Sequence, residues 1–224
     1  IREEFKKLGY TDEEYNKIIH GSSLQEYKPE TLIKKVNEIY GLFIKQGYSR
    51  EETIKMTKQF PSIYSCSIEN IKGKIEQMKK MGYSHDEIIK ITKKLPMMYG
   101  YSIENIREKI EQIKQLGYSR EEAIKITKLF PQIYSCSIEN IKEKIEQMKK
   151  IGYSYDEIIK IAKRLPMIYS FGIENIKEKI EEMKKLGYSQ DEVIKITKIL
   201  PSIYSYSIDN IREKIEEMEK MGYS

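Results

Sequence analysis

Two lysines, three residues apart, recur through the sequence at a fixed interval of 35 residues. Residues three apart lie on one face of an α-helix, so each pair presents two positive charges side by side. The pairs are Lys55 and Lys58, Lys90 and Lys93, Lys125 and Lys128, Lys160 and Lys163, and Lys195 and Lys198. Stacked helices would join them into a continuous row of cations, which can neutralise successive phosphates and release counterions. This chemistry favours a polyanionic partner.

The alternative is that these lysines are ordinary helix formers on a solvated face. The overall charge does not decide, because 40 Lys and Arg stand against 35 Asp and Glu, a net charge of +5. The charge is uneven, however: residues 49–83 carry +3 and residues 189–223 carry −2. On the next helix, Lys142 and Lys144 alternate with Glu143 and Glu146, which cancels that face. The lysine pairs lack such neighbours beyond the first turn of their helix, so we predict nucleic-acid contact there.

Two positions beside the lysine row vary between repeats. One ends the first helix and reads Gln59, Lys94, Leu129, Arg164 and Ile199; the other follows a proline and reads Ser62, Met97, Gln132, Met167 and Ser202. An interval of four residues from a lysine places each on the lysine face. We therefore add Lys94 and Arg164 to the predicted nucleic-acid-binding residues and treat the others as candidate specificity positions. Arg, Lys and Gln can hydrogen-bond to base edges but Leu, Ile and Met cannot, so a base code and drift at half-buried positions both stay open.

The elements that position these residues have explicit start and stop signals. Ser119 and Glu122 form a capping box that begins a short helix, here called helix A of the repeat. Pro131 ends helix A, and the segment to Ser135 has room for one 3₁₀ turn. Ser137 then caps a second helix, helix B, whose end is marked by Gly152 in the usual place of a left-handed cap. Prolines, asparagines and Gly-Tyr-Ser triplets all repeat every 35 residues.

A period of this length is the signature of a solenoid. We predict an all-α helical-repeat solenoid whose units hold two α-helices and a 3₁₀ turn or short third helix, stacked as a curved superhelix. Residues 1–48 form a divergent N-terminal capping repeat, with a longer helix B from Pro29 to Gln46. Five repeats follow at 49–83, 84–118, 119–153, 154–188 and 189–223. The last Gly-Tyr-Ser predicts an array that continues past residue 224.

The order of capping serine, short helix, Leu/Phe-Pro, Tyr-Ser segment and second helix resembles the repeat of the mitochondrial transcription termination factor (mTERF) family. The most specific string is "LPSIYSYSIDN" with its closing glycine, and the resemblance covers Gly9 to Ser224. It implies a basic concave surface that holds nucleic acid, with duplex DNA favoured and RNA as the alternative. It also implies a role in transcription, its termination or RNA metabolism, in mitochondria or another organelle. Tetratricopeptide and pentatricopeptide repeats have nearly this length and stay as alternative folds.

Tyrosine recurs at two positions of the repeat. It follows the proline at Tyr64, Tyr99, Tyr134, Tyr169 and Tyr204, and the glycine at Tyr48, Tyr83, Tyr118, Tyr153, Tyr188 and Tyr223. These rings could stack on bases. Because every repeat must pack alike, we interpret them instead as packing groups whose hydroxyls reach the surface.

No motif predicts catalysis. His20 and His85 have no cysteine or second histidine at metal-ligand spacing, so we expect no metal, no cofactor and no enzyme. Cys66 and Cys136 lie two repeats apart, too far for a disulfide, which favours a reducing intracellular compartment. No apolar run reaches the length of about 20 residues that a membrane span needs. We expect a monomer, and the alternative function is a protein-binding scaffold with Met97 and Met167 as contacts.

Overall fold

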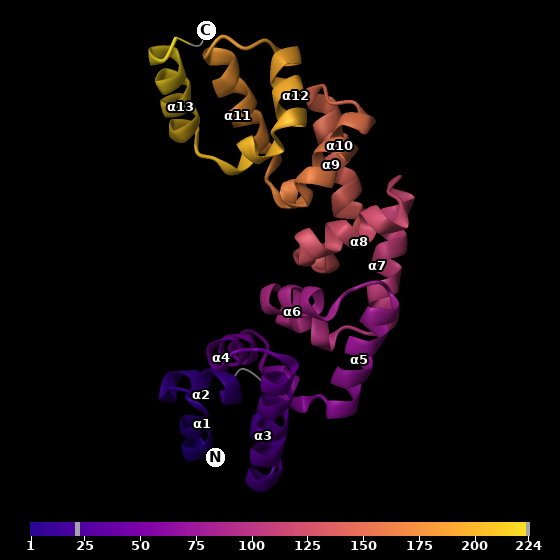
Figure 1. Cartoon of the computed structure of the whole chain (residues 1–224), viewed down its shortest axis with the longest axis vertical. Coiled ribbons are helices and arrows are strands. Elements are labelled where there is room, and N and C mark those ends of the chain that lie inside the picture. Colours follow the sequence, from indigo (N-terminus) through magenta and orange to yellow (C-terminus); the bar gives the residue numbers. More distant parts are fainter. Residues whose placement is uncertain (21–22, 223–224) are drawn as a thin grey trace. The chain divides into compact units, whose positions relative to one another are not determined.

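A computed structural model describes residues 1–20 and 23–222 of the chain, which divides into two units, residues 1–110 and 111–224 (Figure 1). Within the described residues there are thirteen α-helices, six 3₁₀ helices and no strand. The predicted all-α helical-repeat fold is therefore confirmed.

Unit 1 contains the divergent first repeat, the repeat at 49–83 and most of the repeat at 84–118. Its elements are α1 (Arg2–Leu8), α2 (Asp12–His20), η1 (Ser23–Glu26), α3 (Pro29–Gln46), α4 (Arg50–Gln59), η2 (Pro61–Ser65), α5 (Ile68–Lys80), α6 (His85–Lys94), η3 (Pro96–Gly100) and most of α7 (Ile103–Gln115), where η denotes a 3₁₀ helix. Unit 2 continues the same order. Its elements are the end of α7, α8 (Arg120–Leu129), η4 (Pro131–Ser135), α9 (Ile138–Ile151), α10 (Tyr155–Arg164), η5 (Pro166–Ser170), α11 (Ile173–Lys185), α12 (Gln190–Ile199), η6 (Pro201–Ser205) and α13 (Ile208–Lys220).

The local signals of the repeat act as the sequence predicts. The Ser119 hydroxyl accepts from the Glu122 backbone N–H, and Glu122 reaches back to the Ser119 N–H, which completes the capping box of α8. Pro131 opens η4, and Ser137 accepts from the Asn140 N–H at the start of α9. The helix ends at Gly152, whose φ of 113° lies in the left-handed region that suits glycine.

The first repeat is irregular in the predicted way. Thr11 and Glu14 form its capping box, but no proline follows α2, and η1 takes the place of the Pro-initiated 3₁₀ helix. Helix α3 has 18 residues against 13 in α5, which confirms a helix B longer by about one turn. Helix α1 was not predicted; it ends at Gly9 in the same left-handed cap as a helix B.

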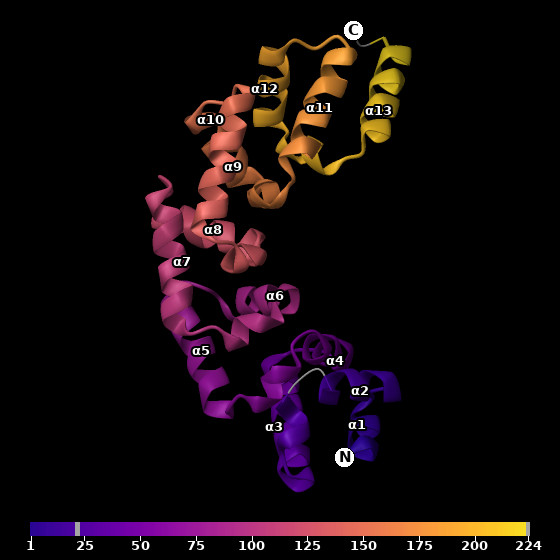
Figure 2. The ribbon, with the colours of Figure 1, turned by 180° about the vertical axis from the view of Figure 1, so that it is seen from behind.

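Equivalent helices lie side by side within each unit. In unit 1, α2 contacts α4, α4 contacts α6, and α3 contacts α5; in unit 2, α8 contacts α10, α10 contacts α12, and α9 contacts α11 (Figures 1 and 2). The buried stripe of each helix B faces this stack. On α9 it consists of Ile141, Ile145 and Met148, each at most 3% exposed. Burial of such side chains supplies most of the stability of a repeat fold.

The first residue of helix A fastens neighbouring repeats. The Arg50 Nε donates to the Leu8 carbonyl at 2.9 Å, and the Tyr155 hydroxyl donates to the Leu116 carbonyl at 2.7 Å. His85 and Gln190 likewise place a ring or amide nitrogen 2.8 and 3.0 Å from a carbonyl at the end of an earlier helix B. These side chains differ in type, yet all can donate a hydrogen bond to a carbonyl that the helix end leaves without a partner.

Tyrosine hydroxyls join neighbouring repeats in the interior. Tyr48, after its glycine, contacts Thr92 at 2.5 Å and Tyr99 at 2.9 Å in the next repeat. The same set recurs as Tyr10 with Thr57 and Tyr64, and as Tyr153 with Thr197 and Tyr204, while Tyr118 pairs with Tyr169 alone because residue 162 is alanine. All of these hydroxyls are buried.

The interpretation of the tyrosines as packing groups is confirmed for those in the described interior, although Tyr188 is half-buried and Tyr223 lies outside the described residues. The expectation that their hydroxyls reach the surface is wrong. A buried hydroxyl needs a hydrogen-bond partner, and here the partner comes from a residue 44 to 54 positions away, beyond the reach of local patterns.

Candidate functional site

The second lysine of each helix A pair is held by the preceding repeat. Lys58 lies 2.9 Å from Glu14 and Lys93 lies 2.5 Å from Glu52. In unit 2, Lys163 lies 2.7 Å from Glu122 and Lys198 lies 2.8 Å from Glu157. These four are called the paired lysines, and their side chains are only 34–38% exposed.

The glutamate in each pair is the one that closes the capping box of its own helix A. One carboxylate oxygen of Glu122 accepts from the Ser119 N–H and the other contacts Lys163. The hydrogen bond from Lys163, followed by the backbone N–H, holds the pKa of Glu122 below its ordinary value. The same two contacts lower the pKa of Glu52 and Glu157. The paired lysines therefore meet acidic partners that the order of residues along one helix does not reveal.

The first lysine of each pair has a different environment. These residues are all exposed, and none forms an ion pair with any acidic group in the described parts of the chain; they are Lys55, Lys90, Lys125, Lys160 and Lys195, called here the outer lysines. They stand at one helix position, one per repeat. An exposed ammonium without an ion pair, repeated at a regular interval, is suited to contact with a phosphate backbone.

The lysines of helix B were interpreted as part of a neutral solvated face, and for three of them this is wrong. Lys109 and Lys179 are only 9% and 8% exposed. Lys179 donates to the Tyr206 carbonyl, and Lys74 donates to the carbonyls of Tyr99, at 2.6 Å, and Tyr101. Lys109 and Lys179, together with half-buried Lys74, are called the buried lysines.

These carbonyls end the 3₁₀ segment of the next repeat. The lysine ammonium therefore donates to carbonyls at the end of a 3₁₀ helix, which would otherwise have no hydrogen-bond donor. Desolvation lowers the pKa of Lys74. Lys74 and Lys179 therefore join neighbouring repeats.

The variable positions are exposed rather than half-buried in most repeats. Leu129 is 48% exposed, Ile199 64%, and Met97 and Met167 about 40%. Gln59, Lys94, Ser62 and Gln132 are exposed as well, whereas Ser202 is half-buried. Large apolar side chains at such exposure are available for contact with another molecule.

The predicted helical link between the lysines and the second variable position does not exist. Helix α4 ends at Gln59, and Phe60 has φ −137° and ψ 73°, outside the helical region. Ser62 therefore belongs to η2 and does not continue the face of Lys58. The proline that fixes this break recurs in every later repeat, so the same holds for the equivalent positions.

Arg164 is a variable side chain with a structural partner. Arg164 donates from Nη1 to the carbonyls of Lys198 and Ile199, at 3.3 and 2.8 Å. It caps the end of helix A in the next repeat. Its predicted role in nucleic-acid contact stays a prediction, as do those of Lys94 and half-buried Lys128.

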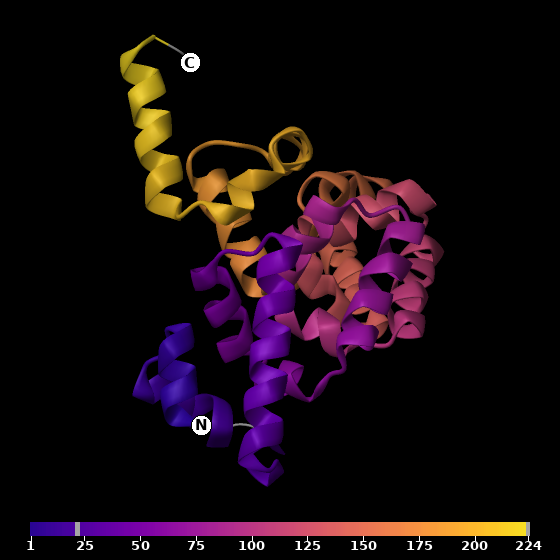
Figure 3. The same cartoon turned by 60° about the horizontal axis from the view of Figure 1, so that its bottom comes forward.

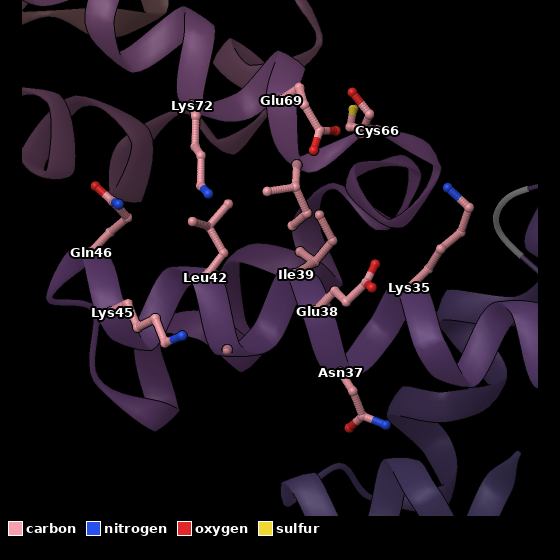
Figure 4. A pocket seen from close by; sticks show the side chains of 13 residues that line it. Lys35, Asn37, Glu38, Ile39, Leu42, Lys45, Gln46, Cys66, Glu69 and Lys72 are labelled. Atoms are coloured by element: carbon pink, nitrogen blue, oxygen red, sulfur yellow. The ribbon is translucent and has the colours of Figure 1, made fainter.

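A groove of about 630 Å³ in unit 1 lies between α3 and the start of α5 (Figure 4). Lys45 and Lys72 come from opposite walls, as do Glu38 and Glu69 (Figure 4). The mixture of charges leaves only a weak preference for anions. The groove contains none of the predicted site residues. One of its walls is α3 of the irregular first repeat, which the repeat pattern of the later units does not describe.

The described residues contain no group of three or more His, Cys, Asp or Glu side chains that could hold a metal ion. None of the helices in the described ranges combines the length and the apolar character needed to cross a bilayer.

Comparison with known proteins gives one assignment. The mTERF family model matches residues 2–150 and 139–224, which together cover nearly the whole chain. A search of curated proteins finds no match.

Proposed function

The chain belongs to the mTERF family of helical-repeat proteins, and on that premise we propose that it binds nucleic acid through the outer lysines. The observation that carries the proposal is the contrast among the lysines. The paired lysines already hold carboxylates of neighbouring repeats, and Lys74 and Lys179 hold carbonyls, whereas the outer lysines form no ion pair in the described structure. One unpaired cation per repeat can follow a phosphate backbone.

Duplex DNA is the favoured ligand. Proteins that bind single strands without sequence preference stack bases on exposed aromatic rings. Most of the recurring tyrosines in the described structure are instead buried, and several of their hydroxyls are bonded to one another. Several variable positions carry Leu, Ile or Met, which make no hydrogen bonds to base edges. Contact with the sugar-phosphate backbone, without contacts to the bases, suits a duplex. RNA is the alternative ligand.

The experiment compares two variants of equal net charge. The first replaces the five outer lysines with glutamine. The second replaces five other exposed lysines, which are Lys45, Lys72, Lys80, Lys142 and Lys150. Affinity for duplex DNA, single-stranded DNA and RNA is measured by fluorescence anisotropy at several salt concentrations.

The outer-lysine variant should lose at least about tenfold in affinity for duplex DNA. In this variant the slope of log K against log salt concentration should become less steep by up to about 5, since each lost phosphate contact removes about one unit of slope. The matched variant should lose much less. Equal losses would mean that only net charge matters, and a greater loss in the matched variant would place the interface on another face.

In the cell, we propose that binding regulates transcription, including its termination, or RNA metabolism, in mitochondria or another organelle. A protein bound to the duplex in this way would obstruct a polymerase moving along the same duplex. Transcription from a template with one high-affinity site should then yield a shortened product, and the outer-lysine variant should restore the full length. Fractionation of cells that express a tagged full-length protein tests the compartment.

A protein-binding scaffold is the second candidate, and the exposed apolar side chains favour it. Leu129, Met167 and Ile199 belong to consecutive repeats of unit 2, and an amphipathic partner helix could cover them. If no nucleic acid binds at low salt, this candidate becomes the better one. Replacement of the three by serine should then reduce partner binding without changing helix content.

A further inference from the structure

Each outer lysine has an exposed carboxylate four residues earlier, in the first turn of its helix A. These residues are called the first-turn carboxylates, one in each 35-residue repeat, and they are Glu51, Asp86, Glu121, Asp156 and Asp191. Because neighbouring helices A lie side by side within each unit, the carboxylates form a second row beside the outer lysines (Figures 1 and 3). An acidic residue four positions before a lysine lies on the same helix face, in the order that favours an ion pair. None of the five forms an ion pair in the described residues.

The first repeat shows the same pair closed. Glu13 and Lys17 have the places that Glu51 and Lys55 have in the next repeat, and the Glu13 carboxylate lies 2.7 Å from the Lys17 Nζ. The hydrogen bond between them raises the pKa of Lys17 and lowers the pKa of Glu13. The backbone of helix A therefore allows this ion pair without any change of fold.

In the later repeats, serine hydroxyls compete with the lysines for these carboxylates. The Ser49 hydroxyl donates to Glu51 and the Ser119 hydroxyl donates to Glu121, each at 2.9 Å. A hydrogen bond from the backbone N–H of each glutamate, followed by that of the serine, holds the pKa of both glutamates below its ordinary value. The other three first-turn carboxylates are aspartates, which are one methylene group shorter than Glu13 and reach less far toward a lysine. The outer lysines therefore lack ion pairs because their carboxylates lie elsewhere, although acidic groups are close by.

A first-turn carboxylate has two competing positions. On its serine or in water it leaves the charge of the outer lysine open to solvent, and on the lysine it cancels that charge. Both groups are exposed, and an ion pair of this kind shifts an equilibrium by only about twofold. The other glutamate of the same turn lacks this freedom, because Glu122 closes the capping box and holds Lys163 of the next repeat. In α8, Glu121 is therefore the carboxylate that is left for Lys125.

We propose that the first-turn carboxylates compete with the phosphates of nucleic acid for the outer lysines and thereby lower the affinity of that surface. The inference rests on the proposed function and adds its regulation. A phosphate backbone meets every outer lysine in turn and releases condensed counterions, so it displaces the carboxylates. A single acidic side chain of another protein offers only what each outer lysine already has four residues away, at the high effective concentration of an intramolecular group. The carboxylates therefore favour a polyanion over isolated acidic groups, and the closed pair of the first repeat keeps Lys17 out of the surface.

The test compares two variants that gain the same positive charge. The first carries Glu51→Gln, Asp86→Asn, Glu121→Gln, Asp156→Asn and Asp191→Asn. The second replaces five exposed glutamates of helix B by glutamine, one in each repeat, and these are Glu69, Glu104, Glu139, Glu178 and Glu213. Affinity for duplex DNA is measured by fluorescence anisotropy, and circular dichroism checks the helix content. The first variant should bind at least about fivefold more tightly than the second, since each of the five pairs contributes up to about twofold. Equal gains would overturn the proposal, because net charge alone would then explain them.

The same carboxylate changes are then made in the chain whose outer lysines are replaced by glutamine. Their effect on affinity should fall to that of the helix B variant, because the cations that the carboxylates cover are gone. A larger gain that persists in this chain would show that the carboxylates act on other cations, which also overturns the proposal. If the five changes together reduce helix content, Glu121→Gln with Asp156→Asn gives a smaller variant, in which the expected gain is about twofold to fourfold.

A measurement without nucleic acid separates this proposal from the proposed function. Carbon-13 NMR titration follows the carboxyl groups of Glu51 and Glu121 in the original chain and after Lys55→Gln and Lys125→Gln. Loss of the lysine should raise the pKa of its glutamate, since a nearby cation favours the charged form. Lys150→Gln on helix B is the control and should leave both pKa values unchanged. An unchanged pKa after loss of the outer lysine would overturn the competition and leave the proposed function intact. If no variant binds nucleic acid, both are overturned.

Discussion

Helix A and helix B both carry lysine in every repeat, but the outer lysines of helix A and the buried lysines of helix B have opposite environments. Lys125 and Lys160 stand in water, whereas Lys179 is 8% exposed and bound to a carbonyl of the next repeat. In sequence, the helix B lysines looked neutralised by nearby glutamates and the helix A lysines looked unpaired. The neighbouring repeat changes the assignment, because in a solenoid the partners of a side chain lie one period away.

The recurring tyrosines, like Lys179, are mostly buried against a neighbouring repeat. Their burial should have its largest effect on stability at alkaline pH. Desolvation raises the pKa of the buried tyrosines, which are Tyr10, Tyr48, Tyr64, Tyr99, Tyr118, Tyr153, Tyr169 and Tyr204. Above pH 10 the unfolded chain loses these protons but the folded chain keeps them. The contribution of these tyrosines to stability should therefore be steady below pH 10 and fall above it.

Each buried tyrosine lowers the free energy of unfolding by up to about 1.4 kcal/mol for every pH unit above 10. Desolvation lowers the pKa of Lys74 and Lys144, which acts in the opposite direction because the unfolded chain then binds more protons. Two lysines do not offset eight tyrosines. Urea unfolding midpoints between pH 8 and pH 11 measure the balance, and a constant midpoint up to pH 11 would contradict the buried hydroxyls.

Lys179→Glu tests the buried lysines directly. A carboxylate would face the Tyr206 carbonyl in a site that is 8% exposed, so the free energy of unfolding should fall by about 3–5 kcal/mol. Lys214→Glu is the matched control, because Lys214 has the same place in the next repeat but is exposed. It should lower the free energy of unfolding by less than about 1 kcal/mol, since it loses only an exposed ion pair with Glu217. If both variants lose the same stability, burial of the lysine is not the cause.

The sequence predicted the features of the repeat that depend on neighbours along the chain. Ser119, Pro131 and Gly152 act locally, through a cap, a missing donor and a left-handed turn, and the structure has all three in place. It did not predict the bond between Lys163 and Glu122, because that contact spans 41 positions and requires the packing of α8 against α10. For the buried hydroxyls a signal was available: tyrosine, threonine and tyrosine recur together, and among the five 35-residue repeats only one, with Ala162, lacks the threonine.

Tyr153→Phe tests the interior hydroxyls one at a time. The change removes one oxygen and leaves the Tyr204 hydroxyl buried without its partner, so we expect a loss of about 1–3 kcal/mol. Tyr155→Phe is the control. Its hydroxyl contacts the Leu116 carbonyl, but the residue is 39% exposed, so water can replace the lost donor. A similar loss in both variants, measured by urea unfolding, would show that burial of the hydroxyl does not set its contribution.

The smallest expected effect is a gain, at the one tyrosine pair without a threonine. Where threonine is present, every proton has an acceptor: one tyrosine hydroxyl can donate to the other, that one to the threonine, and the threonine to a helix carbonyl, as Thr197 does to Val193 at 2.9 Å. Tyr118 and Tyr169 bond only to each other in the described residues, so one of the two protons has no acceptor.

Ala162→Thr should supply that acceptor and raise the free energy of unfolding by about 1 kcal/mol, the usual net value of one hydrogen bond. Ala162→Val is the control, because valine has nearly the same shape as threonine but no hydroxyl. Ala162 is fully buried, so both changes add volume to the core and any cost of overpacking appears in both. The difference between threonine and valine isolates the hydroxyl. A threonine variant no more stable than the valine variant would show that the tyrosine pair is already satisfied, and that the threonines of the other repeats contribute packing alone.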